Sequence, residues 1–108
     1  MDAAEKAGQT LAKMQQQAGD VFAKYLGFTK EISGIGPIDH KTQELIHIAC
    51  AIMSQCDMCI SLHIQAAAGL GASKEEIMQA ALLPMAMGGS PKMMQMKYVF
   101  DELEDLFD

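Results

Sequence analysis

The sequence contains no tryptophan, few aromatic residues and few basic ones. Aromatic side chains make up 6% of its 108 residues, and eight basic residues stand against fourteen acidic ones, for a formal net charge of −6. Nucleic-acid binding depends on a basic face that neutralises phosphates. The basic residues here are scattered along the chain, which argues against a nucleic-acid partner.

Long apolar runs and a secretion signal are also missing. No apolar stretch reaches the roughly 18 residues that a membrane-spanning helix needs, and residues 1–10 lack the basic-then-apolar order of a signal peptide. Only three cysteines are present, two of them in one CxxC, which suits a redox or metal site better than a secreted disulfide framework. We therefore expect a cytoplasmic protein with no membrane partner.

Small and flexible apolar residues are abundant. Half of the residues are hydrophobic and ten are methionine, while no stretch suggests a β-sheet. Alanine and methionine favour helices that pack through small or adaptable side chains, so we predict an all-α protein. Residues 1–108 suffice for a single domain. A hydrophobic share this high in so small a domain predicts a homo-oligomer.

Apolar spacing and capping residues predict five to six helices, two of which form an antiparallel pair that carries the CxxC. The predicted N-caps are Asp39, Ser54 and Ser73. The predicted helices cover residues 1–28, 41–53, 54–68, a stretch from Ser73 to a break at Pro84, and 92–107.

Three further expectations concern loops and burial. Glycines and a proline predict a connecting loop over residues 27–37. The helix over residues 41–53 is expected to be buried on most of its sides. The last helix is expected to pack three apolar residues inward, beneath an acidic, solvated surface: Leu103, Leu106 and Phe107.

The stretch from Glu44 to His63 carries the reactive residues. Cys56 and Cys59 form the CxxC, whose i, i+3 spacing on a helix lets the sulfurs meet, and the partial positive charge of a first helical turn stabilises a thiolate. Asp57 works against that effect, so another group must help to take the proton. His63 follows Cys59 by four residues, roughly 6 Å along the same helical face, and can serve as the base.

Glu44 joins this set only if the chain turns back at Ser54. In one straight helix, Glu44 would lie about 18 Å from Cys56. If the helices before and after Ser54 run antiparallel, a rise of ~1.5 Å per residue brings Glu44 to within about one turn of the level of His63. The carboxylate can then orient the imidazole and stabilise its charge. The predicted site is a relay of thiol, base and carboxylate.

Such a relay suits the reduction of a peroxide or a disulfide. A thiolate attacks, a sulfenic acid or mixed disulfide forms, and the second thiol closes the Cys56–Cys59 disulfide. An external thiol reductant, such as a lipoyl, thioredoxin-like or other dithiol donor, must reopen it. The chemistry calls for no cofactor, and we expect no metal ligand among these residues.

Four segments match the pattern of a known family: Asp39–Ile46, Cys56–Cys59 with His63, Gly71–Ile77 and Met87–Gly89. Over about residues 37–100 the chain resembles the carboxymuconolactone decarboxylase and AhpD-like alkylhydroperoxidase family. The resemblance implies an all-helical fold that assembles as a homotrimer or homohexamer. For the two-cysteine branch, it implies antioxidant peroxidase (peroxiredoxin-like) or disulfide reductase activity.

The resemblance also implies a role for each site residue. Glu44 and His63 would form the proton relay, Cys59 would be the thiol that meets the peroxide, and Cys56 would be the resolving thiol. The well-studied peroxidases of this branch have a histidine just before the second cysteine, where Met58 stands here. That difference bears on peroxide turnover more than on dithiol exchange.

Two other functions are alternatives at this point. A lyase acting on a lactone-like acid would use His63 and Glu44 for proton transfer and leave the cysteines idle. A non-catalytic oligomeric or zinc-binding module is the third hypothesis, although a structural zinc needs four ligands and the chain has no second CxxC or HxxxH. Cys50 is expected to fill the core, and His47 to line the site.

Overall fold

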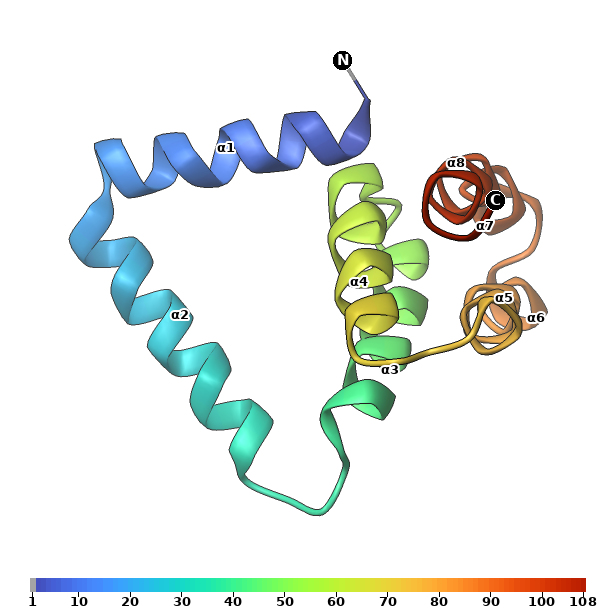
Figure 1. Ribbon diagram of the computed structural model, residues 1–108, viewed down its shortest axis with the longest axis horizontal. Helices are drawn as coiled ribbons and strands as arrows, with labels where there is room; N and C mark the ends of the chain where they lie inside the picture. The colour runs from blue at the N-terminus through green and yellow to red at the C-terminus, as the bar shows by residue number, and fades with distance from the viewer. Residues whose placement is uncertain (1) are drawn as a thin grey trace.

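The computed structural model describes residues 2–108, and within them the chain is helical apart from short turns and loops (Figure 1). No strand occurs in the described part, so the all-α prediction is confirmed. None of the described helices is long and apolar enough to cross a membrane. Six helices have nine or more residues and two are shorter: α1 (Ala3–Gln17), α2 (Gly19–Gly34), α3 (His40–Met53), α4 (Asp57–Gly69), α5 (Lys74–Leu82), α6 (Met85–Gly88), α7 (Ser90–Met94) and α8 (Met96–Phe107).

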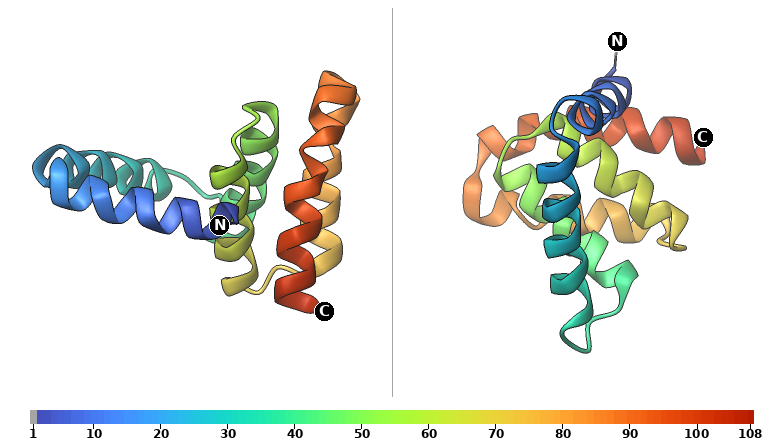
Figure 2. Two further views of the ribbon diagram at one scale, coloured as in Figure 1. Left: turned by 90° about the horizontal axis from the view of Figure 1, so that it is seen from above. Right: turned by 90° about the vertical axis from the view of Figure 1, so that its left-hand side faces the viewer.

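Two groups of helices meet at α4 (Figures 1 and 2). The antiparallel pair α3 and α4 runs through the middle, and α5 and α8 pack against it on one side. On the other side α1 crosses the start of α4, while α2 slants away from the rest. The end of α4 that carries the CxxC therefore lies next to α1.

The hydrophobic core lies where α3, α4, α5 and α8 meet. Burying one large aliphatic side chain there stabilises the fold by about 1.5–3 kcal/mol. The largest fully buried apolar side chains are Ile48, Ile52, Ile60, Ile64, Ile77 and Val99.

A polar pair lies within the same interior and links α4 to α8. The Ser61 hydroxyl donates a hydrogen bond to the buried carboxylate of Glu102, and Gln65 Nε2 donates to the other carboxylate oxygen at 3.2 Å. A buried carboxylate without such donors would be strongly destabilising. The pair therefore fixes the position of α8 on α4.

Two of the predicted N-caps are confirmed. Asp39 accepts a hydrogen bond from the Thr42 backbone N–H at 2.8 Å, and hydrogen bonding to Thr42 holds the pKa of Asp39 below its ordinary value. Ser73 and Glu76 form a complete capping box, and the backbone N–H of Ser73 holds the pKa of Glu76 low. As predicted, the chain breaks at Pro84, directly after α5.

The N-terminal prediction is wrong in two respects. In place of one helix over residues 1–28, the chain breaks at Ala18, whose φ of −145° and ψ of 45° are not helical. The predicted loop at residues 27–37 begins only after Gly34, because α2 continues through Gly27. A glycine inside a helix costs only about 1 kcal/mol relative to alanine. Gly27 alone therefore does not end the helix.

The C-terminal helix is also divided. The chain forms the short α7 and bends at Gln95 before α8, where we predicted one helix over residues 92–107. Pro91 lies in the first turn of α7, where a backbone N–H would have no helical partner. The helical segment therefore begins at Ser90, two residues before the predicted start.

Several burial predictions are wrong for the chain taken alone. Leu103 is buried, but Leu106 and Phe107 are exposed. The α3 helix buries Ile48, Ala51 and Ile52 and leaves three of its apolar positions exposed: Ile46, Cys50 and Met53. An almost uniformly apolar helix does not reveal which of its faces packs against the core.

Candidate functional site

The chain reverses direction between α3 and α4, as the relay requires. Ser54 ends α3, Gln55 adopts a φ of 54°, and Cys56 is the N-cap of α4. The prediction that Ser54 caps the second helix is therefore wrong. A residue with a left-handed backbone conformation cannot lie inside a right-handed helix. Holding a non-glycine residue in that conformation costs on the order of 1 kcal/mol. Lys92 of α7 supports the turn by donating to Gln55 Oε1 at 2.7 Å.

The two sulfurs lie at the start of α4 and form the Cys56–Cys59 disulfide, with the Cα atoms 5.2 Å apart. Cys56 Sγ accepts a hydrogen bond from the Cys59 backbone N–H at 3.2 Å, in the way that an oxygen does at an N-cap. When the disulfide is reduced, this position stabilises a thiolate on Cys56.

Lys6 of α1 offsets the negative charge that Asp57 places beside the sulfurs. Its Nζ lies 2.9 Å from Asp57 Oδ2. This hydrogen bond holds the pKa of Asp57 below its ordinary value and raises the pKa of Lys6. The role of Lys6 could not be predicted from the sequence, because the two residues are 51 positions apart and no local pattern connects them.

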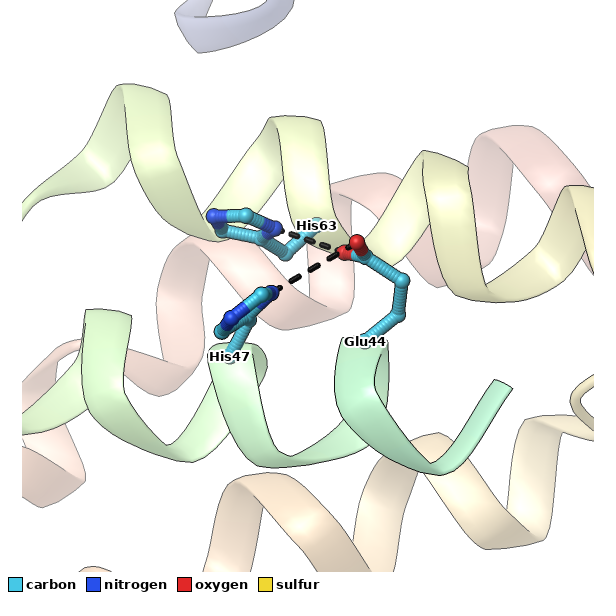
Figure 3. Close-up of side chains that lie close together, drawn as sticks. All are labelled: Glu44, His47 and His63. Carbon is cyan, nitrogen blue, oxygen red and sulfur yellow. Dashed lines mark hydrogen bonds and ion pairs between the residues drawn. The ribbon is translucent and has the colours of Figure 1, made fainter. Parts of the chain in front are cut away.

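Glu44 and His63 meet across the antiparallel pair, as predicted. His63 Nδ1 on α4 lies 2.7 Å from Glu44 Oε2 on α3, and both side chains are partly buried (Figure 3). Cys59 precedes His63 by one turn of α4, so the two residues share a face of that helix. The carboxylate fixes the orientation of the imidazole.

His47 lines the site as a second imidazole. Its Nδ1 lies 3.5 Å from Glu44 Oε1, and its ring centroid is 4.8 Å from that of His63 (Figure 3). The i, i+3 spacing of Glu44 and His47 places both on the face of α3 that looks towards α4. Both imidazoles therefore approach one carboxylate.

Cys50 and Met58 lie apart from this group. Cys50 is a free, exposed thiol in an apolar groove between α3 and α5, so the expectation that it fills the core is wrong. Met58 turns towards α1, where Thr10 Oγ1 lies 3.8 Å from its sulfur. The position that carries a histidine in the peroxidases resembled by this chain is therefore occupied by a thioether under α1.

Fold and site together define an all-helical protein whose antiparallel helix pair carries a CxxC disulfide beside a glutamate–histidine pair. The model of the carboxymuconolactone decarboxylase family matches residues 19–102. The chain belongs to this family.

Two relatives agree with that assignment. A carboxymuconolactone decarboxylase family protein from Legionella pneumophila, solved by crystallography in its apo form, superimposes with a TM-score of 0.87 at 26% identity, over 98% of this chain and 95% of that one. A Paracoccus denitrificans protein described as uncharacterized protein 4 in the cox locus is 32% identical over 75 residues, which cover 69% of this chain and 68% of the relative.

Proposed function

We propose that the protein is a thiol–disulfide oxidoreductase with peroxidase-type chemistry, in which Glu44 and His63 activate the Cys56–Cys59 dithiol. The observation that carries the proposal is the 2.7 Å contact between His63 and Glu44. It joins a base on the helix of the cysteines to a carboxylate that orients it. A nucleophile, a base and an orienting acid are the parts that thiol activation requires.

The oxidative half-reaction uses each of the four residues once. His63 takes the proton of the Cys59 thiol while Glu44 stabilises the imidazolium. The Cys59 thiolate attacks one peroxide oxygen, the O–O bond breaks, and the leaving oxygen takes the proton back from His63 and departs as an alcohol or water, so that Cys59 becomes a sulfenic acid. The Cys56 thiol attacks the Cys59 sulfur, water leaves, and the disulfide forms.

Reduction consumes an external dithiol, and the site favours one direction of attack. A donor thiolate that attacks Cys59 Sγ releases Cys56 as a thiolate at the N-cap of α4, where the backbone N–H of Cys59 stabilises it. The second thiol of the donor then attacks the mixed disulfide and releases the Cys59 thiolate. The donor leaves as an intramolecular disulfide. A lipoyl group or a thioredoxin-like dithiol has the required chemistry.

The presence of Met58 leads us to expect that disulfide exchange is faster than peroxide reduction. A thioether neither donates nor accepts a proton, so this position cannot assist the departure of the alcohol from a peroxide. Disulfide exchange needs only a thiolate and a good leaving thiol. We therefore expect the protein to react faster with a low-molecular-weight disulfide than with hydrogen peroxide.

Stopped-flow measurement of thiol loss tests the proposal. The reduced protein is mixed with hydrogen peroxide or with an oxidised dithiol, and the thiols that remain on the protein are counted over time, since exchange with a disulfide releases one small-molecule thiol for each protein thiol consumed. Cys59→Ser should abolish the fast phase, and Cys56→Ser should stop the reaction at the sulfenic acid or mixed disulfide. A reduced parent protein that keeps its thiols with both oxidants would refute the proposal.

We also propose that the protein assembles as a homotrimer or homohexamer in the cytoplasm. The α2 helix buries no residue within its own chain, although it carries a series of large apolar side chains. Exposed apolar patches of this kind mark interaction surfaces. Sedimentation equilibrium tests the assembly, and a monomer at micromolar concentration would refute it.

A further inference from the structure

The three side chains Glu44, His47 and His63 present more ligand atoms than a proton relay uses. One carboxylate and one imidazole suffice to activate a thiol. The second imidazole, that of His47, has no role in the proposed dithiol chemistry. All three residues nevertheless place one nitrogen or oxygen ligand atom within 4.8 Å of the others.

We propose that Glu44, His47 and His63 form a binding site for a divalent transition-metal ion of the zinc class. Two imidazoles and one carboxylate are a ligand set that binds zinc and related ions with coordination positions left for water. This inference goes beyond the proposed dithiol function and does not depend on it. It also departs from our expectation, based on the sequence, of no metal ligand.

The measured distances suit such an ion. Ligands bound to tetrahedral zinc at ~2.05 Å lie about 3.3 Å from one another. The two imidazole Nδ1 atoms lie 2.7 Å and 3.5 Å from the two oxygens of the Glu44 carboxylate, on either side of the ideal value. Figure 3 shows both rings turned towards that carboxylate. The three ligand atoms lie within 4.8 Å of one another, so binding one ion requires the most distant pair to move closer together.

Charge also favours a cation at this position. The Glu44 carboxylate, which both imidazole nitrogens approach, supplies negative charge for a cation. Zinc-class ions bind imidazole in its neutral form. Among residues 2–108, no lysine forms an ion pair with Glu44, so no lysine competes for the carboxylate.

An ion can reach the site from solvent. The side chains of Glu44, His63 and His47 are 21%, 34% and 47% exposed, so the helix pair need not open to admit it. In this oxidised form neither cysteine of the CxxC offers a thiolate to the ion, since the two are joined in the disulfide. A bound ion would occupy the carboxylate and the imidazole that the relay uses. Metal binding and proton transfer therefore exclude each other.

Calorimetric titration of the disulfide form with Zn²⁺, and with Co²⁺ as a spectroscopic probe, tests this inference without peroxide or reductant. A Cys50→Ser background removes the remaining free thiol, so that no sulfur ligand is present. We expect one ion per chain and a Co²⁺ absorption spectrum without a thiolate charge-transfer band. His47→Ala should weaken binding by at least about 10-fold, since even loss of a group that only supports a ligand has an effect of this size.

His40→Ala is the matched control, because His40 lies at the start of the same helix and hydrogen-bonds Ser33 instead of Glu44. It should bind the ion as the parent does. Binding well below one ion per chain, or equal affinity in His47→Ala and the parent, would overturn the inference. If His47→Ala does not fold, thermal melts of the parent protein test the inference instead. Binding of Zn²⁺ to the folded state must raise the melting temperature by mass action. A melting temperature that does not change with added Zn²⁺ would overturn the inference.

Discussion

The two halves of the molecule differ in how they use their apolar residues. The α3–α4 pair and the helices packed on it enclose a core of fully buried aliphatic side chains, although Ile46, Leu82 and Leu106 stay exposed, whereas α1 buries only Ala7 and α2 buries nothing. Yet α2 is also apolar, and its exposed large side chains are Val21, Tyr25, Leu26, Phe28 and Ile32. The packed half therefore holds the site in position within one chain, while the arm formed by α1 and α2 presents a surface suited to another chain.

The arm is nevertheless joined to the site at one end. Lys6 and Thr10 of α1 contact Asp57 and Met58 at the start of α4. A partner that binds α2 could therefore influence the charge beside the sulfurs through α1. The contrast between the two halves can therefore be tested through the reactivity of the cysteines as well as through the stability of the fold.

The largest expected difference between the halves concerns stability. Ile60→Ala in the packed half should lower the free energy of unfolding by about 2–5 kcal/mol, because it removes buried methyl groups and leaves a cavity. Ile35→Ala beyond the end of α2, where the side chain is 83% exposed, should change it by less than about 0.5 kcal/mol. Urea unfolding at low protein concentration measures both. Equal losses would show that the arm belongs to the same cooperative core.

The capping residues sharpen the comparison within the packed half. Ser73→Ala should cost about 0.5–2 kcal/mol, because it removes the hydroxyl of a complete capping box. Ser54→Ala should cost almost nothing, since Cys56 and not Ser54 caps α4. The same unfolding assay compares them, and a larger loss for Ser54→Ala would contradict the observed turn.

Lys6→Ala tests the link between the arm and the site. An exposed ion pair of this kind contributes little to stability, so the variant should fold normally. Without the lysine, the Asp57 carboxylate is no longer offset, and the pKa of the reduced Cys56 thiol should rise. The pH dependence of alkylation measures that pKa. Lys13→Ala, which changes another lysine of α1, is the control and should leave it unchanged.

Acid should destabilise the packed half through three carboxylates. The pKa values of Asp39, Asp57 and Glu76 are held below their ordinary values in the folded protein, by Thr42, Lys6 and Ser73 respectively. Their contribution to stability is therefore fully present above the ordinary carboxyl range and is lost as the pH falls through the lowered values. Thermal melts from pH 6 downward should show the loss beginning below about pH 4.5. A melting temperature that rises on acidification would contradict this assignment.

Much of the packed half could be predicted from local sequence. The caps at Asp39 and Ser73, the break at Pro84 and the reversal before the CxxC each depend on a few adjacent residues. Counting the helical rise on either side of the reversal was enough to place Glu44 near His63. The arrangement of the relay was therefore accessible because it depends on distances along two neighbouring helices.

Other features depend on contacts that no local pattern encodes. Ser54 and Cys56 both offer an acceptor for a helix start, and the left-handed Gln55, held by Lys92, decides between them. The pairing of Lys6 with Asp57 joins helices that are distant in sequence. On the apolar α3 helix, sequence could not tell that Cys50 faces outward. Long-range packing selects among local alternatives of similar energy.

The central claim is that Glu44, acting through His63, activates the dithiol, and Glu44→Gln tests it most directly. The variant keeps the shape of the side chain and removes its charge, while Glu75→Gln on the exposed face of α5 serves as the matched control. The measurement is the stopped-flow rate of oxidation of the reduced protein. A positioned base contributes about 10²–10⁴-fold to proton transfer, so we expect Glu44→Gln to slow the reaction at least 10-fold and Glu75→Gln to leave it unchanged. Equal rates in Glu44→Gln and the parent protein would contradict the account.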